Sequence, residues 1–167
     1  MMTEADFIVD ELKQAFDGDP WHGDSLMDIL RGVTARAASH RPLSAAHTIW
    51  ELVLHITAWR REVASRMRGN PAGEPPAGGW PAAPSGEGAA EAAWRGALED
   101  LAATQRELLD AVRALDPAKL HAPVKDARDQ HMGTGKSHAA MLHGLAQHDA
   151  YHTGQIALLK KDSGLRV

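Results

Sequence analysis

The sequence contains no cysteine, so neither disulfides nor thiolate metal ligands can form within the chain. Any metal site must therefore use imidazole nitrogens and carboxylate oxygens. Aromatic residues are scarce, at 5% of the chain, and no apolar run approaches the roughly 18 residues of a membrane-spanning helix. The formal net charge of -4 is also unlike the basic charge of most nucleic-acid-binding domains. We therefore expect neither a membrane nor a nucleic acid as partner.

The length of 167 residues fits a single helical domain over residues 1–167, with a hydrophobic core of its own. The first segment, Met1 to Phe16, is acidic and amphipathic, whereas a secretory signal peptide is basic and then apolar. A cytoplasmic location is the resulting expectation.

Capping residues and apolar stripes predict a short N-terminal helix followed by four longer helices. The clearest start is Thr48-Ile-Trp-Glu51, a capping box in which the first and last residues exchange side-chain to backbone hydrogen bonds. Glycine and proline mark helix ends, as in Gly69-Asn70-Pro71. The expected ranges are 3–16 for the short helix and 25–39, 48–68, 89–115 and 137–161 for the others. This pattern is typical of an all-α four-helix bundle.

Residues 70–88 are rich in proline and glycine and are predicted to form a long loop. A helix over 48–68 is about 30 Å long, and an extended loop of this size reaches about 60 Å. The loop can therefore return the chain along the bundle, so that the second and third bundle helices run parallel as in crossover bundles. Trp80 lies in this loop and is expected to cover apolar surface, either on the bundle or on a partner.

Two of the ten histidines lie one helical turn apart on a stripe that should face the core. This stripe contains Met141, Leu145, His148, His152, Ile156 and Leu159. His55 lies on the inward stripe of the 48–68 helix. Two stacked imidazoles that face a third have few hydrogen-bond partners among leucines. With ten histidines such a pair also arises readily by chance, so spacing alone leaves a metal site and a metal-free core pair equally open.

The i,i+4 spacing suits chelation, because it places two imidazoles on one face with Cβ atoms about 6 Å apart. Both nitrogens can then approach a first-row metal at about 2.0–2.1 Å. Three neutral histidines leave coordination positions open, which is the catalytic rather than the structural pattern. Such a site lowers the pKa of a bound water or thiol.

The stretch His148-Asp-Ala-Tyr-His152 also resembles the H-E-x-x-H motif of zinc proteases, with Asp149 in the glutamate position. Aspartate is one methylene shorter and reaches a metal-bound water less well, so a protease is disfavoured. We expect the Asp149 carboxylate either to contact a metal-ligating side chain without binding the metal itself, or to lie at the surface. Tyr151 and Gln155 either orient a ligand imidazole or a bound water, or serve as a packing residue and a surface amide.

The remaining histidines are expected to be solvated or hydrogen bonded. His47 precedes the cap of its helix, and His22 lies in a Trp-His-Gly turn. Either of them could line the mouth of a site.

Three stretches together resemble the DinB-like, or YfiT-like, superfamily of helical proteins, which is labelled as metal-dependent hydrolases. They are Trp21-His-Gly-Asp-Ser-Leu26, His47-Thr-Ile-Trp-Glu-Leu-Val-Leu-His55-Ile-Thr-Ala-Trp59 and His148-Asp-Ala-Tyr-His152-Thr-Gly-Gln-Ile156. Their order and separation also match, so the resemblance covers nearly the whole chain.

The resemblance implies a four-helix bundle with a long crossover, and a metal triad at His55, His148 and His152 that holds nickel or zinc. It also implies a homodimer. Characterised relatives include S-transferases and isomerases that use a low-molecular-weight thiol such as bacillithiol or mycothiol. No motif in this sequence selects a particular thiol, so the choice of thiol is analogy.

These observations support two main hypotheses. The first is a metal-dependent thiol S-transferase, since the chain has an open all-histidine site and no cysteine of its own to act as nucleophile. The second is a non-catalytic, stress-associated protein. In such a protein the bound metal links the helices of the bundle, or the protein senses metal availability. A metal-free helical interaction module is a third possibility.

Overall fold

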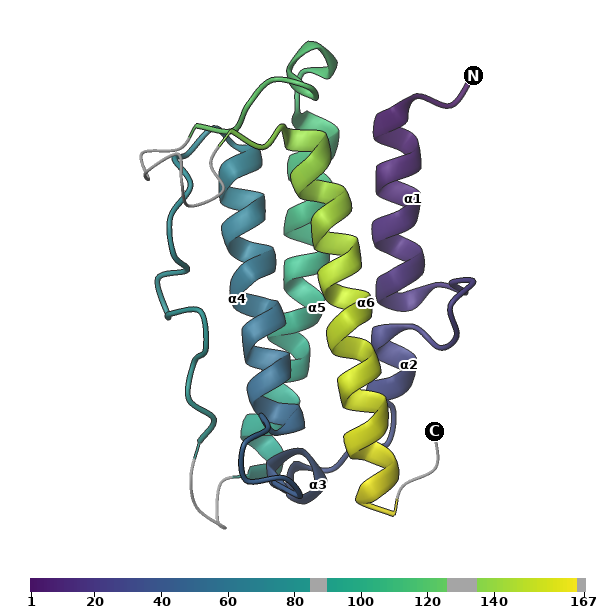
Figure 1. Cartoon of the computed structure of the whole chain (residues 1–167), viewed down its shortest axis with the longest axis vertical. Helices are drawn as coiled ribbons and strands as arrows, with labels where there is room; N and C mark the ends of the chain where they lie inside the picture. The colour runs from purple at the N-terminus through teal and green to yellow at the C-terminus, as the bar shows by residue number, and fades with distance from the viewer. Residues whose placement is uncertain (85–89, 126–134, 165–167) are drawn as a thin grey trace.

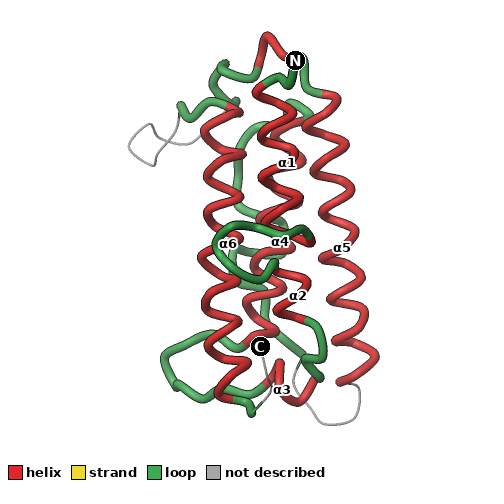
Figure 2. Tube along the Cα trace, turned by 90° about the vertical axis from the view of Figure 1, so that its right-hand side faces the viewer, coloured by secondary structure: helices red, strands yellow, loops and turns green. Residues whose placement is uncertain are grey.

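The computed structural model describes residues 1–84, 90–125 and 135–164, and these residues contain helices and no β-strand. The all-helical prediction is therefore confirmed. The elements are α1 (Glu4–Asp17), α2 (Leu26–Leu30), α3 (Ala35–Ser39), α4 (Ile49–Met67), α5 (Ala90–Ala114), the 3-10 helix η1 (Pro117–Lys119) and α6 (His138–Asp162). Four long helices, α1, α4, α5 and α6, lie side by side, an arrangement compatible with a four-helix bundle (Figure 1). Figure 2, turned by 90°, shows the same alignment of their axes.

Helices α4 and α5 run in the same direction. The guanidinium of Arg61 donates to the carboxylate of Asp100 at 2.8 Å, and Arg68 donates to the backbone carbonyl of Glu107 at 3.3 Å. Both partners advance by seven residues, as they must when two helices are parallel. The chain after α4 descends along the outer side of that helix before α5 begins (Figure 1). Residues 85–88 of the predicted loop lie outside the described part of the chain.

Helix α6 runs opposite to α4. Arg60 contacts Asp149, whereas Arg66, further along α4, contacts the sulfur of Met141, which lies earlier on α6. This antiparallel pairing places the two histidines in the middle of α6 beside the first half of α4.

The three long helices after residue 48 begin and end within one residue of the predicted bounds. For α4 the reason is local, because both hydrogen bonds of the capping box are formed. The Glu51 amide donates to the Thr48 hydroxyl at 3.2 Å, and the Thr48 amide donates to the Glu51 carboxylate at 2.8 Å. The cap fixes the start of α4 and therefore the direction in which each later side chain points.

The second predicted helix was wrong as a single element, because the chain forms α2 and α3 with a break between them. Gly32 in the break has φ of +76°, a conformation that ends a right-handed helix and favours glycine. The carbonyls of Arg31 and Val33 accept hydrogen bonds from the buried side chains of Lys160, at 2.9 Å, and Trp94, at 2.7 Å. Tertiary hydrogen bonds thus replace the helical ones that a continuous element would have made.

The N-terminal helix also has a larger role than its predicted length suggested. Ile8, Leu12 and Phe16 of α1 are buried, and α1 lies along α6 with α2 beneath it (Figure 1). Helix α1 is therefore one of the four long helices, whereas the predicted 25–39 helix supplies only the short segments α2 and α3.

The core consists of two apolar clusters, one toward each end of the bundle. One cluster ends at Ile56 on α4 and Leu101 on α5, and the other begins at Val63 and Leu108. Between them lies a set of buried or half-buried polar side chains, which we call the polar layer: Arg60, Gln105, His148, Asp149 and His152.

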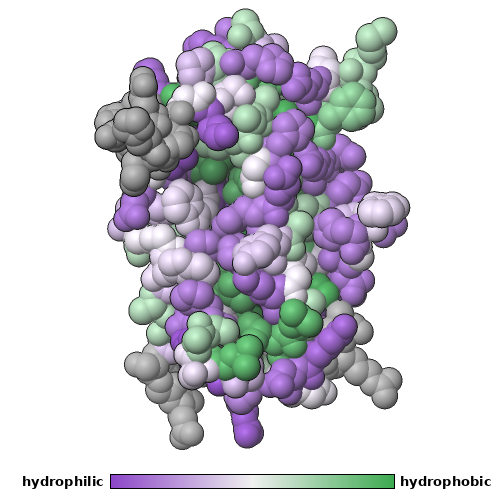
Figure 3. Space-filling model, in the orientation of Figure 1, coloured by the Kyte–Doolittle hydropathy of each residue, from purple (hydrophilic) through white to green (hydrophobic). Residues whose placement is uncertain are grey.

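None of the described helices combines the length and the apolarity that crossing a bilayer requires. The face shown in Figure 3 is largely hydrophilic, with apolar residues gathered near the lower end.

Candidate metal centre

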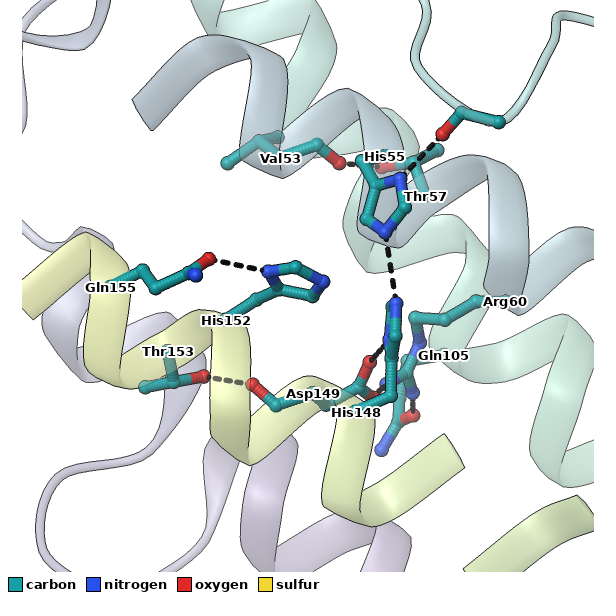
Figure 4. A network of polar contacts seen from close by, with 11 residues as sticks. Val53, His55, Thr57, Arg60, Gln105, His148, Asp149, His152, Thr153 and Gln155 are labelled. Atoms are coloured by element: carbon teal, nitrogen blue, oxygen red, sulfur yellow. Dashed lines mark hydrogen bonds and ion pairs between the residues drawn. The ribbon is translucent and has the colours of Figure 1, made fainter. Parts of the chain in front are cut away.

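The structure brings together the three histidines that the sequence analysis singled out. His55 comes from α4, and His148 and His152 come from successive turns of α6; one ring nitrogen from each lies within 4.8 Å of the others. The Nε2 atoms of His55 and His148 are 3.0 Å apart. Figure 4 shows the three rings pointing into one space between the two helices.

The three rings differ in their access to solvent. His55 and His152 are buried, whereas the side chain of His148 is 27% exposed. His148 is therefore the ring through which the cluster has most contact with solvent.

Each Nδ1 atom faces an oxygen on the far side of its ring. His55 Nδ1 contacts the backbone carbonyl of Gly79, His148 Nδ1 is 3.4 Å from Asp149 Oδ1, and His152 Nδ1 is 2.7 Å from Gln155 Oε1. A carbonyl and a carboxylate only accept hydrogen bonds, so these Nδ1 atoms must donate.

The outer hydrogen bonds determine the chemistry of the inner face. A neutral imidazole that donates from Nδ1 carries a lone pair on Nε2. The Nε2 atoms of His55 and His148 then face each other as two acceptors, and a cation bound between them would relieve their repulsion. A set of neutral imidazole nitrogens is the donor type that zinc, nickel and similar ions prefer. The cluster can therefore hold a divalent metal.

Burial favours the neutral form of these rings. The pKa of His55 is lowered to about 4, chiefly by burial; the hydrogen bond to Gly79 opposes this shift, and the nearby rings of His148 and His152 contribute to it. Burial also lowers the pKa of His152, and the neighbouring His148 adds to this effect. Both residues are uncharged at neutral pH, which is the state that metal coordination requires.

The segment after α4 forms one wall of the centre. The Trp80 indole stacks between two imidazoles, with ring centroids 3.7 Å from His55 and 3.6 Å from His47. Trp80 therefore packs on the bundle, while 45% of the residue stays exposed, and a contact of this exposed part with a partner stays a prediction. His47 lies next to Trp80 at the edge of the cluster.

The same segment is anchored further up α4. The Gly73 amide donates to the Glu62 carboxylate at 2.9 Å, and Arg66 donates to the Gly73 carbonyl at 2.8 Å. Because Glu62 and Arg66 are themselves paired and buried, they hold this part of the loop against the helix. The Gly79 carbonyl, which contacts His55, therefore belongs to a segment that is attached to α4.

The remaining sequence candidates lie in different places. Gln155 accepts a hydrogen bond from His152, which is the orienting alternative considered for it. Tyr151 is largely exposed, with its ring edge-on to His152 at 5.0 Å between centroids. His22 is exposed in the loop before α2, and it is not part of the three-histidine cluster.

Asp149 has no exposure to solvent, so its predicted surface alternative is wrong. It pairs with Arg60, which is also fully buried and which the sequence analysis missed. Charged side chains are usually exposed, so the sequence did not suggest Arg60 as a core residue. A signal was nevertheless present, since Arg60 lies four residues after Ile56 and three before Val63 on the inward stripe of α4.

The fold and the cluster define a helical bundle that carries three converging histidines, one of them partly exposed. A family model of the DinB superfamily matches residues 21–156, most of the chain. The chain belongs to the DinB superfamily. No curated protein and no solved structure matches it.

Proposed function

We propose that His55, His148 and His152 bind a divalent metal, nickel or zinc, and that the protein is a metal-dependent S-transferase for a bacillithiol-type thiol. The observation that carries this proposal is the convergence of three histidines beside a solvent-accessible edge. When bound, the metal lowers the pKa of a coordinated thiol or water, which supplies a nucleophile near neutral pH. The chain contains no cysteine, so a reacting thiol must come from a small molecule.

The residues of the chain have distinct roles in this proposal. The three imidazoles would hold the ion and leave coordination positions for a water or a thiol. Gly79 and Gln155 orient His55 and His152 through Nδ1. Trp80 covers the His55 ring, so a small molecule approaches from the side of His148.

The test begins with metal analysis of untagged protein purified without chelators, because a histidine tag would bind metal by itself. The metal-loaded protein is then mixed with bacillithiol and an alkyl or aryl halide. In the reaction a sulfur–carbon bond forms, the carbon–halogen bond breaks, and the thiol proton and halide are released. We expect metal-dependent turnover that is lost in His148→Ala.

The matched control is His143→Ala. His143 lies on the same helix, but it pairs with Glu11 at 2.7 Å and is outside the cluster. Equal rates for His148→Ala and the native protein would contradict the transferase proposal.

A specific observation also favours the non-catalytic, stress-associated alternative. The three histidines come from both α4 and α6, so a bound ion would link two helices. In this case chelation lowers the melting temperature strongly, and no thiol binds near the ion. Apo and metal-loaded protein that melt together would contradict the stapling role. The homodimer implied by the resemblance stays a prediction, which sedimentation velocity would test.

A further inference from the structure

The carboxylate of Asp149 is fully buried and faces two partners. Oδ2 pairs with the guanidinium of Arg60, and Oδ1 lies 3.4 Å from Nδ1 of His148 (Figure 4). Asp149 therefore connects the three-histidine cluster to a buried charge in the middle of the bundle.

Arg60 is held in place from the opposite side. Its guanidinium donates to Gln105 on α5 and lies 4.5 Å from the centroid of the Phe16 ring on α1. Gln105 in turn donates to the backbone carbonyl of Leu12 at 3.2 Å. A guanidinium stays charged and only donates, so the oxygen that faces it must accept.

Stability alone does not account for a buried ion pair at this place. Removing two charges from water costs so much that a well-packed apolar pair often stabilises a core equally well or better. The pair is nevertheless surrounded by apolar clusters on both sides. Its contact with His148 is the feature that an apolar pair would not reproduce.

His148 is also the ring that most needs an anchor. It is more exposed than His55 and His152, so packing restricts its rotation least. A carboxylate beside Nδ1 permits only the tautomer with a proton on Nδ1, which leaves the Nε2 lone pair for the cluster.

We propose that Asp149, held by Arg60, is a positioning residue that fixes His148 in the Nδ1–H tautomer with Nε2 directed at His55 and His152. This inference rests on the proposed metal site and adds the group that orients its most exposed ligand. It also assigns Asp149 a role different from that of the glutamate in zinc proteases, because a fully buried carboxylate paired with arginine is not available as a general base.

The test is Asp149→Asn, which preserves the shape of the side chain. Arg60 requires an acceptor, so the asparagine oxygen turns toward Arg60 and its NH2 group toward His148. His148 Nδ1 must then accept, and the proton moves to Nε2. Long-range 1H–15N correlation spectra of the metal-free proteins should show the Nδ1–H tautomer in the native protein and the Nε2–H tautomer in the variant. Metal affinity should fall about tenfold to hundredfold.

The control is Thr104→Val, which removes a buried hydrogen bond to the Leu101 carbonyl on α5 and leaves the contacts among Arg60, Asp149 and His148 in place. It should lower the melting temperature while leaving the His148 tautomer and the metal affinity unchanged. An equal loss of metal affinity in both variants would show a general structural effect and overturn the proposal. An Asp149→Asn protein with a native tautomer and native affinity would overturn it as well.

The native protein provides a measurement that does not depend on any variant. If its metal-free form shows His148 protonated on Nε2, the positioning role is wrong, even where Asp149→Asn fails to fold. Conversely, a native Nδ1–H tautomer that switches in the variant, together with no metal binding by the native protein, would retain the positioning role and reject the proposed function.

Discussion

The Nε2 atoms of His55 and His148 lie 3.0 Å apart, although the two residues are 93 positions apart in the sequence. Their outer nitrogens face a carbonyl and a carboxylate, so both inner nitrogens carry lone pairs. Two acceptors at this distance repel each other, and a bound cation would relieve this repulsion. Protons and a metal ion would therefore compete for the same nitrogens, and this competition can be measured.

The first prediction concerns the metal-free protein. The pKa of His55 is lowered to about 4, whereas in the unfolded chain it has the ordinary value near 6.5. Between these values the unfolded state binds more protons, so the free energy of unfolding decreases as the pH falls from about 6.5 to about 4. Urea unfolding across this range should show the decrease, and His55→Gln should reduce its slope. An unchanged slope in His55→Gln, with His143→Gln as control, would contradict the assignment.

The second prediction concerns metal retention. Each imidazole must be neutral to coordinate, so protons compete with the ion. Dialysis followed by metal analysis should find less bound metal at pH 5 than at pH 8. Equal retention at the two pH values would argue against three histidine ligands.

The third prediction concerns Trp80. Its indole stacks on both His47 and His55, and a stacked pair of rings contributes about 0.5–1.5 kcal/mol. Trp80→Ala should lower the free energy of unfolding and expose His55, so that a chelator removes the metal faster. Stopped-flow transfer of the ion to a coloured chelator measures this rate.

Trp21→Ala is the matched control for Trp80→Ala, because Trp21 is fully exposed. It should leave both the stability and the chelation rate unchanged. If the two tryptophan variants release metal at the same rate, Trp80 does not protect the centre.

The fourth prediction compares two neighbouring arginines. Arg60→Ala leaves the buried Asp149 unpaired and should cost roughly 3–5 kcal/mol of unfolding free energy. Arg61→Ala breaks an exposed pair with Asp100, which contributes about 0–1 kcal/mol. Chemical denaturation of both variants provides the comparison. Similar losses would mean that the buried pair contributes no more than the surface pair.

The sequence was most informative where the cause of structure is local. The Thr48–Glu51 capping box and the apolar stripes predicted α4, α5 and α6 closely, since capping and periodicity act within a few residues. The capping box and the stripe together also placed His55 on the inner face of α4. The meeting of His55 with His148 follows once α4 and α6 pack antiparallel.

Features that depend on distant partners were not predictable in this way. The break between α2 and α3 is stabilised by Lys160 and Trp94, which lie far away in the sequence. The docking of Trp80 depends on two rings, one from His47 just before α4 and one from His55 within that helix. Arg60 is compatible with burial only because α5 and α6 supply its partners, and composition alone does not reveal them.

The polar layer has a consequence for how the helices align along the bundle. Leucines and valines tolerate many offsets between neighbouring helices, because apolar contacts have no direction. A helix that slid by one turn, about 5.4 Å, would move Arg60, Asp149 or Gln105 out of reach of its partner and place it against an apolar cluster. The polar layer thus favours one axial alignment of α4, α5 and α6. The same alignment brings the three histidines to the same level along the bundle.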